Sequence, residues 1–205
     1  MRPVNEELAA QLLEAGKAEF LEHGFRGASL RSIAARLGVT TGAIYRYYAD
    51  KESLFEALVE KPARELERRD REVQQSFSEL PLEEQLTGFP RITAEERDWM
   101  IEYIYDHFDA FKLIVCCSAG TQYEHYIDVL VEIEENASRV LIDRLLGAGR
   151  AVRRLDDALI HIVAHAFFSG MFETVAHNMP REKAMAYMGS LKDFYAAGWF
   201  KILGI

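Results

Sequence analysis

The chain has 205 residues, of which 49% are hydrophobic and 28% charged, so it carries enough apolar material for a sizeable core. Its net charge of -9 argues against a protein that coats nucleic acid without sequence preference, although the distribution of charge matters more than its sum. The sequence has two adjacent cysteines, no predicted signal peptide and no apolar stretch long enough to span a bilayer. Together these features indicate a soluble, cytoplasmic protein.

Apolar residues recur at intervals of three and four along the chain, which predicts an all-α fold. The first helix is expected over about residues 5–22 and ends at Gly24, because glycine takes a positive φ angle easily. Two short helices follow. A fourth is expected over 51–61, where Pro62 ends or kinks it because proline lacks an N–H. We place a domain boundary there, between domains 1–61 and 62–205.

The larger C-terminal domain is expected to consist of longer helices. Thr93 and Glu96 have the spacing of a capping box, which predicts a helix start at Thr93. Pro180 suits the first position of the last helix. The expected ranges are 63–79, 93–107, 111–118, 122–146, 156–177 and 180–203.

The stretch from Gly27 to Phe55 reads GASLRSIAARLGVTTGAIYRYYADKESLF. Ser29 and Thr40 are placed to cap two short helices, and Gly38 makes the tight turn between them. Two short helices joined by a glycine-containing turn are typical of a helix-turn-helix. The outer face of the second is expected to be small or hydroxyl-bearing, which suits a helix in the major groove. That face comprises Thr41, Gly42, Ala43, Tyr45 and Tyr47.

Basic residues concentrate in the same part of the chain. Between Gly24 and Lys51 there are five basic residues against Asp50 alone, a local net charge of +4. The remainder of the chain then carries -13, so one segment suits a polyanion and the rest does not.

The run from Ser29 through Gly38-Val39 to Tyr45, Tyr47-Tyr48 and Lys51-Glu52 resembles the DNA-binding head of the TetR family of bacterial transcriptional regulators (TetR/AcrR type). The resemblance covers about residues 8–58. It implies that Arg31 reaches a base edge and that Tyr45 and Lys51 contact phosphates, while Arg46 is either a phosphate contact or a solvated side chain. The implied DNA-binding residues are Ser29, Arg31, Thr40, Thr41, Gly42, Ala43, Tyr45, Arg46, Tyr47 and Lys51.

The resemblance further implies a homodimeric repressor that a small-molecule effector, of a kind the sequence does not identify, releases from a palindromic operator in duplex DNA. In the family, the last two helices form the dimer interface. Here they carry mixed stripes of small and aromatic residues, which either meet a second copy or close the monomer's own core. The stripes are Ala158, Ile162, His165, Ser169 and Phe172 or Glu173 on one helix, and Tyr187, Leu191, Phe194, Tyr195, Gly198 and Ile202 on the other.

An aromatic-rich set on the middle helices is the expected effector site, although such side chains also fill ordinary cores. His161 and His165 have a metal-compatible spacing, but no further ligands complete a site, so neither a metal nor a cofactor is expected. The sequence contains no phosphate-binding loop, dinucleotide fingerprint or nucleophile elbow, so an enzyme is not expected. The alternative is a helical protein-interaction module. The expected effector residues are Trp99, Tyr103, His107, Phe108, Phe111, Tyr123, Tyr126, Phe167 and Met171.

Overall fold

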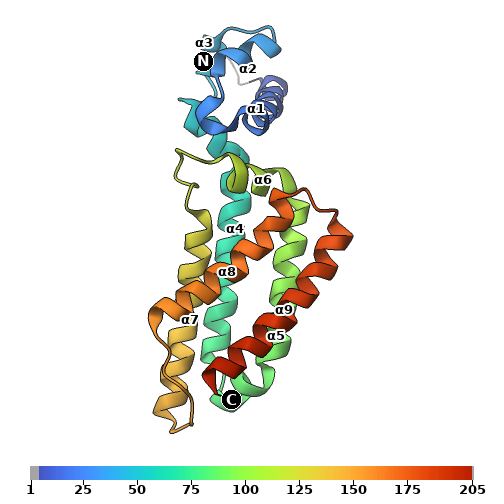
Figure 1. Ribbon diagram of the computed structural model, residues 1–205. Coiled ribbons are helices and arrows are strands. Elements are labelled where there is room, and N and C mark those ends of the chain that lie inside the picture. Colours follow the sequence, from blue (N-terminus) through green and yellow to red (C-terminus); the bar gives the residue numbers. More distant parts are fainter. Residues whose placement is uncertain (1–4, 205) are drawn as a thin grey trace. The chain divides into compact units, whose positions relative to one another are not determined.

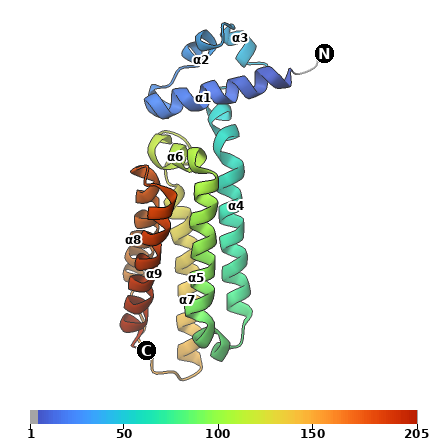
Figure 2. The same ribbon diagram turned by 90° about the vertical axis from the view of Figure 1, so that its right-hand side faces the viewer.

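The computed structural model describes residues 5–204, and for residues 88–97 it describes the backbone alone. Every described secondary-structure element is a helix, which confirms the predicted all-α fold (Figures 1 and 2). The chain divides into two compact units. Unit 1 comprises Met1–Arg64 and His107–Tyr126, and unit 2 comprises Glu65–Asp106 and Ile127–Ile205. Unit 1 therefore includes a segment far along the chain from the helix-turn-helix, and the domain boundary at residues 61 and 62 stays a prediction.

Unit 1 begins with a long helix that is interrupted near its end. Asn5 caps it by accepting hydrogen bonds from two backbone N–H groups at 3.0 and 3.3 Å. Gly24 breaks it with φ 66° and ψ 169°, which confirms the predicted role of this glycine. The helices of unit 1 are α1 (Glu6–Gly27), α2 (Leu30–Arg36), α3 (Thr41–Ile44), the first part of α4 (Lys51–Glu79) and α6 (Phe108–Cys117).

The core of unit 1 is aromatic. The rings of Phe20 and Phe55 meet edge-on at 5.1 Å, and Phe25 meets Phe55 in the same way at 5.5 Å. Such pairs add about 0.5–1.5 kcal/mol to what burial of their area contributes. α6 joins this core by packing on α1, where Lys17 pairs with Asp109 at 3.1 Å. The core therefore packs α1 against both α4 and α6.

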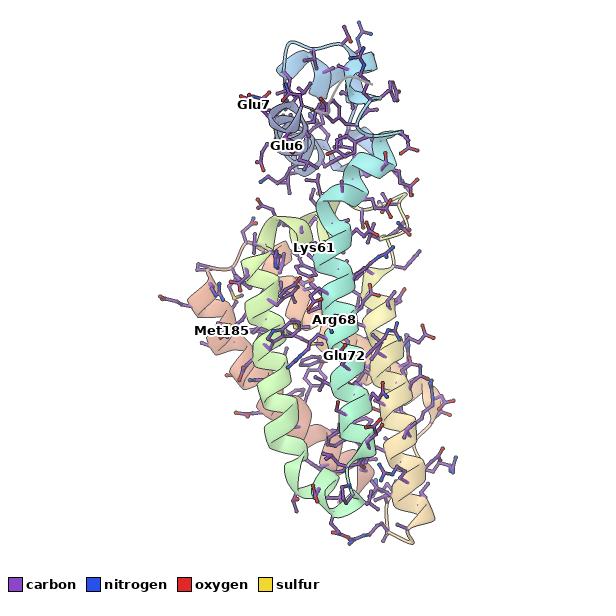
Figure 3. All side chains as sticks on the ribbon, turned by 180° about the vertical axis from the view of Figure 1, so that it is seen from behind. Glu6, Glu7, Lys61, Arg68, Glu72 and Met185 are labelled. Atoms are coloured by element: carbon purple, nitrogen blue, oxygen red, sulfur yellow. The ribbon has the colours of Figure 1, made fainter. Side chains whose placement is uncertain are left out.

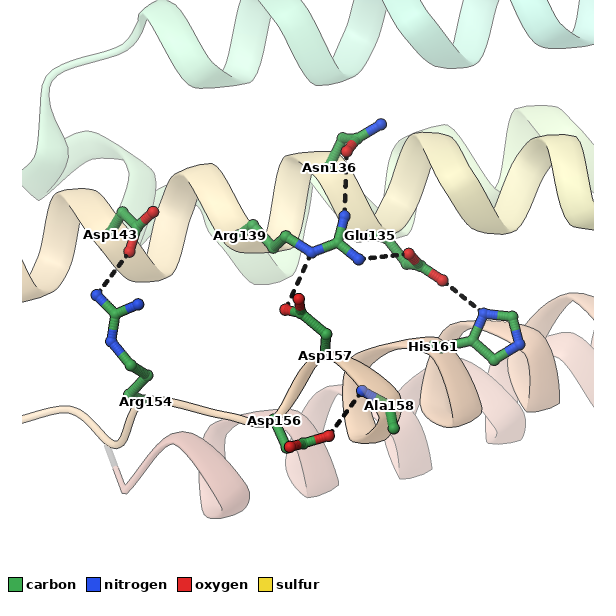
Figure 4. Close-up of polar contacts among 9 residues, drawn as sticks. All are labelled: Glu135, Asn136, Arg139, Asp143, Arg154, Asp156, Asp157, Ala158 and His161. Carbon is green, nitrogen blue, oxygen red and sulfur yellow. Dashed lines mark hydrogen bonds and ion pairs between the residues drawn. The ribbon is translucent and has the colours of Figure 1, made fainter.

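Unit 2 is a bundle of long helices (Figures 1 and 2). α5 packs along α9, and the Tyr105 hydroxyl donates to the carbonyl of Met179 at 2.9 Å. Between α7 and α8, Glu135 accepts from Arg139 at 2.6 Å and lies 2.6 Å from the His161 Nδ1 (Figure 4). Besides the rest of α4, the helices are α5 (Leu82–Asp106), α7 (Tyr126–Gly147, apart from its first residue), α8 (Asp157–Ala176) and α9 (Arg181–Leu203).

α8 is the most apolar helix of unit 2. By length and composition alone it is apolar enough to cross a membrane, with a mean hydropathy of 1.4, which the sequence analysis did not anticipate. Its inner face is buried in the unit, where Phe168, Met171 and Phe172 are at most 2% exposed. A core helix of a soluble protein passes the same test, so the composition of α8 has a structural explanation in burial.

The two largest errors in the expected helix boundaries concern α4 and α5. α4 does not end at Pro62 but continues to Glu79. Figure 3 labels Lys61 before the proline, and Arg68 and Glu72 after it in the same helix. The lost N–H is offset because Val59, Ala63 and Leu66, which flank the proline, are completely buried. α5 likewise begins at Leu82 rather than at Thr93, and the side chains of the expected capping box lie outside the described residues.

Candidate nucleic-acid interface

The start of α2 is fixed by a cap and by a buried carboxylate. The Ser29 hydroxyl accepts a hydrogen bond from the Arg31 backbone N–H at 3.2 Å, which confirms that this serine caps the helix. Its own N–H donates to Glu19 on α1 at 3.1 Å, and Glu19 is only 2% exposed. Arg36 at the end of α2 pairs with Glu19 at 3.6 Å and with Glu22 at 2.6 Å. Both ends of α2 are thus tied to α1, a restraint that the sequence analysis did not identify.

The turn between α2 and α3 is a tight glycine turn, as predicted. Gly38 has φ 64°, in the left-handed region that residues with side chains avoid. Val39 then returns its N–H to the carbonyl of Ala34 at 3.0 Å. Thr40 occupies the cap position of α3, but its side chain makes no capping hydrogen bond, so that expectation is wrong. α3 is instead held by Ile44, which is completely buried.

The predicted DNA-facing surface is accessible. The residues Arg31, Gly42, Tyr45 and Arg46 are exposed, and Tyr45 presents 57% of its surface. Thr41 and Ala43 are half-buried at the start of α3. Short and hydroxyl-bearing side chains therefore surround the first turn of this helix, with an arginine before it and another after it.

The five basic residues of the segment are not equivalent. Arg26 lies 3.7 Å from Glu124, and Arg36 is paired with the acids of α1. Arg31 and Arg46, in contrast, have no ion-pair partner among the described residues of the chain. The uncompensated positive charge therefore flanks α3, which is where a polyanion would be met.

Lys51 is engaged within unit 1. Its ammonium nitrogen lies 2.6 Å from the carbonyl oxygen of Phe25, 2.9 Å from that of Ala28 and 3.4 Å from that of Arg26. It also lies 4.5 Å above the Phe25 ring. A lysine has three N–H donors, and all three have acceptors here. Lys51 thus holds the chain after Gly24, and the expected phosphate contact stays a prediction.

The entrance to α4 is well ordered by its own side chains. The Asp50 carboxylate accepts from the Ser53 N–H at 2.7 Å, and the Ser53 hydroxyl lies 3.1 Å from the Asp50 N–H. This reciprocal pair is a capping box. Tyr47, just before it, accepts a hydrogen bond from the Asn5 N–H at 3.2 Å, and its hydroxyl hydrogen stays available to an acceptor such as a phosphate. Burial raises the pKa of the neighbouring Tyr48 phenol.

A family model described as bacterial regulatory proteins, tetR family, matches residues 12–58, the segment that contains this surface. Residues 12–58 of this chain therefore form a DNA-binding segment of the TetR type. Over 58 residues, 28% of the chain, it is 38% identical to the HTH-type transcriptional regulator Rv1816 of Mycobacterium tuberculosis. Over 90 residues, 44% of the chain, it is 39% identical to the HTH-type transcriptional repressor AcnR of Corynebacterium glutamicum. These matches span only 25% and 44% of the two relatives.

The likeness to solved TetR-family structures extends over nearly the whole chain. The transcriptional regulator FadR of Bacillus subtilis, solved in complex with stearoyl-CoA, superposes with a TM-score of 0.57 at 16% identity. The superposition covers 93% of this chain and 98% of that one. At this identity the likeness shows the fold alone.

The expected effector residues are divided between the two units. In unit 1, Phe111 is completely buried and Tyr126 donates to the carbonyl of Ala63 at 2.9 Å, so both belong to its core. Tyr123 stands 6.2 Å from Phe55 there, and His107 and Phe108 begin α6. In unit 2, Trp99 stacks on Tyr103 at 5.0 Å, while Phe167 and Met171 are buried on α8. A small hollow between α7, α8 and α9 has Phe167 in its lining and none of the other eight residues.

The outer face of α8 and α9 is apolar and exposed. Ile162 and Phe194 present 61% and 71% of their surfaces, and Leu159 and Tyr187 present 39% and 46%. Phe172, which was one of two options for this face, is buried at 1% exposure, while Glu173 is exposed. Large exposed apolar side chains on two neighbouring helices are typical of a protein contact surface.

Proposed function

We propose that this protein is a cytoplasmic transcriptional regulator of the TetR family, most simply a repressor, that binds a palindromic operator in duplex DNA as a homodimer. The observation that supports this best is the pairing pattern of the basic residues. Arg36 is neutralised within unit 1, whereas Arg31 and Arg46 flank the exposed start of α3 without an ion-pair partner among the described residues. In this proposal α3 enters the major groove, Arg31 reads a base and Arg46 binds a phosphate.

Selection of binding sites from random duplex DNA tests the proposal. We expect a palindrome whose half-sites are about one helical turn apart. Arg31→Ala should relax the preference at one base pair, at a cost of about 1–3 kcal/mol, whereas Arg46→Ala should weaken binding to all sequences and lower the salt slope by about 1.

Arg36→Ala is the matched control, because it removes an arginine of the same segment that is already paired with Glu19 and Glu22. It should leave the selected sequence unchanged. An unselective pool from a folded wild-type protein would contradict the proposal, as would equal losses for Arg31→Ala on specific and random DNA. Absence of binding to heparin or duplex DNA at low salt would instead favour a helical protein-interaction module, because a DNA-binding head is retained there and released as the salt rises.

Homodimerisation through α8 and α9 rests on the exposed apolar face of these helices. Two copies of one face form an isologous interface, and the resulting two-fold axis matches that of a palindrome. Phe194→Asp places a charge on the most exposed aromatic residue of the face and should give monomers in light scattering after size-exclusion chromatography. Val140→Asp, which alters an exposed apolar residue of α7, is the control and should stay dimeric. An unchanged mass for Phe194→Asp would place the interface elsewhere.

Release from DNA by a small effector is the remaining part of the proposal. α4 runs without interruption from Lys51 to Glu79, so a single helix belongs to unit 1 at one end and to unit 2 at the other. A ligand that favours one placement of the two units would change the spacing of two heads. Spin labels on the two α3 helices would measure this distance. Equal head separations with and without a releasing compound would refute the mechanism.

A further inference from the structure

The place where α2 begins depends on one side chain of α1. α2 packs on α1, and its buried residues are Ile33 and Ala34 (Figure 2). Contacts between apolar side chains are not directional, so by themselves they allow a short helix to slide and to turn about its axis. The Glu19 carboxylate, in contrast, accepts a hydrogen bond from the Ser29 N–H at 3.1 Å, and such a bond tolerates only a narrow range of distances and angles. This bond therefore fixes the first residue of the helix.

The Glu19 carboxylate is itself held in place. Glu19 is 2% exposed, so water does not compete for its oxygens. Its Oε1 receives the Ser29 N–H, and its Oε2 lies 3.6 Å from Arg36 Nη2 at the other end of α2. Arg36 is bound more closely to Glu22, at 2.6 Å, and this hydrogen bond lowers the pKa of the Glu22 carboxyl. Glu22 is thus the main partner of Arg36, and Ser29 is the main partner of Glu19.

Ser29 connects Glu19 with Arg31. The Ser29 hydroxyl accepts from the Arg31 N–H at 3.2 Å, so two successive hydrogen bonds lead from the buried carboxylate to the backbone of Arg31. The Arg31 side chain is exposed and has no ion-pair partner among the described residues. A group that recognises its target by directed hydrogen bonds has to be held within about 0.5 Å of the productive place. The backbone of Arg31 receives this restraint from α1.

We propose that Glu19 is a positioning residue for the reading of the DNA sequence. It is buried and contacts no DNA, but through Ser29 it sets the place from which Arg31 reaches a base. The inference rests on the proposed function, in which Arg31 reads a base. It implies that the length of the Glu19 side chain and its acceptor oxygen determine the base preference, and that its charge does not.

Three substitutions of Glu19 separate these properties. Glu19→Gln keeps the length and an oxygen that accepts from Ser29, so it should keep the base preference of the wild type. Glu19→Met keeps the length without an acceptor, and Glu19→Asp keeps the charge on a side chain that is one methylene shorter. At the base pair whose preference Arg31→Ala relaxes, we expect a loss of about tenfold for Glu19→Met and about threefold for Glu19→Asp.

Binding-site selection with the full-length variants, followed by titration of the selected duplex and its single-base variants, measures these losses. Glu19→Gln and Glu19→Met remove the same charge, so the non-specific electrostatic attraction to DNA changes equally in both. The difference between them therefore reports the acceptor alone. Circular dichroism at the assay temperature establishes that each variant is folded. Should Glu19→Met not fold, the comparison of Glu19→Asp with Glu19→Gln decides the question.

A double substitution tests whether Glu19 acts through Arg31. Added to Arg31→Ala, Glu19→Met should cause no further loss at this base pair, because the side chain that Glu19 places is then absent. Arg36→Ala is the structural control. It removes the cation beside the same carboxylate and leaves the Ser29 contact, so it should lower the urea midpoint without changing the base preference.

The outcomes distinguish this inference from the proposed function. A wild-type protein that selects no sequence would refute both. A preference that is lost in Arg31→Ala but retained in folded Glu19→Met would overturn the positioning role alone. The same holds for a preference that Glu19→Gln loses and Glu19→Asp keeps, because charge would then be the determining property. Additive losses in the double substitution would likewise show that Glu19 does not act through Arg31.

Discussion

Two roles can be compared for Lys51. The family resemblance implies a contact with a DNA phosphate, whereas the contacts in the structure imply a contribution to folding. A phosphate-binding lysine keeps its ammonium free, whereas here three carbonyl oxygens near the end of α1 surround it at 2.6–3.4 Å. Lys51→Met keeps most of the apolar stem and removes the donors. The variant therefore separates a contribution to folding from a contribution to DNA binding.

The expected loss of stability follows from the contacts. A hydrogen bond to a charged group contributes about 1.5–3 kcal/mol. Two of the three contacts of Lys51 are short, and we take the lower value for each because the side chain is half-buried. The free energy of unfolding should then fall by about 3 kcal/mol, which corresponds to a decrease in Tm of about 6–12 °C for a chain of this length.

Urea and thermal unfolding measure this change, and Lys61→Met is the matched control. Lys61 lies exposed on the same helix, so its replacement should change the free energy of unfolding by less than about 0.5 kcal/mol (Figure 3). DNA affinity of Lys51→Met, measured where the protein is fully folded, should stay within a few-fold of the wild type. Unchanged stability together with a salt slope lowered by about 1 would refute the structural role and restore the phosphate contact.

Two further substitutions and one labelling experiment test other parts of the structure. Glu19→Gln should lower the free energy of unfolding by about 1–2 kcal/mol, because a charged acceptor for the Ser29 N–H is lost; an unchanged urea midpoint would contradict this. Gly38→Ala should cost about 1–2 kcal/mol in the same assay, since its φ is positive although the space around it is open, and an unaffected variant would show that the turn relaxes. Burial raises the pKa of Cys117, so iodoacetamide should label the exposed Cys116 first, and equal labelling rates would argue against this burial. The stability linked to the raised pKa of Cys117 is fully present at pH values below the ordinary pKa range of a thiol. It is lost as the pH rises through the raised pKa.

The helix-turn-helix was largely predictable because its signals are local. A capping serine and a glycine turn act within a few residues of one another, and the structure confirms Ser29 and Gly38 in these roles. The buried Glu19 was not predictable, because its partners lie on another helix and a glutamate in an amphipathic helix usually faces water.

The rest of the site depends on contacts between distant segments. Sequence spacing does not show that α6 packs on α1, so the expected effector residues were grouped although the fold divides them between the two units. Aromatic composition predicted that unit 2 has a core, but not where that core leaves space.

Pro62 shows how tertiary contacts override a local rule. The proline cannot donate to the carbonyl of Leu58, and a proline inside a helix costs about 3 kcal/mol relative to alanine. α4 nevertheless continues through it, because the flanking Val59 and Ala63 are completely buried. Replacing Pro62 by a residue that restores this hydrogen bond should therefore stabilise the protein, provided that the proline ring itself contributes little to packing.

Pro62→Ala should raise the free energy of unfolding by about 1–3 kcal/mol and slow the hydrogen exchange of the amides in the turns around it. Lys61→Ala, at the adjacent exposed position, is the control and should leave both quantities nearly unchanged. A destabilised Pro62→Ala would mean that the ring contributes more through packing than its missing donor costs. Slower local exchange together with weaker release from DNA would instead assign to Pro62 the flexibility of α4 that the proposed mechanism requires.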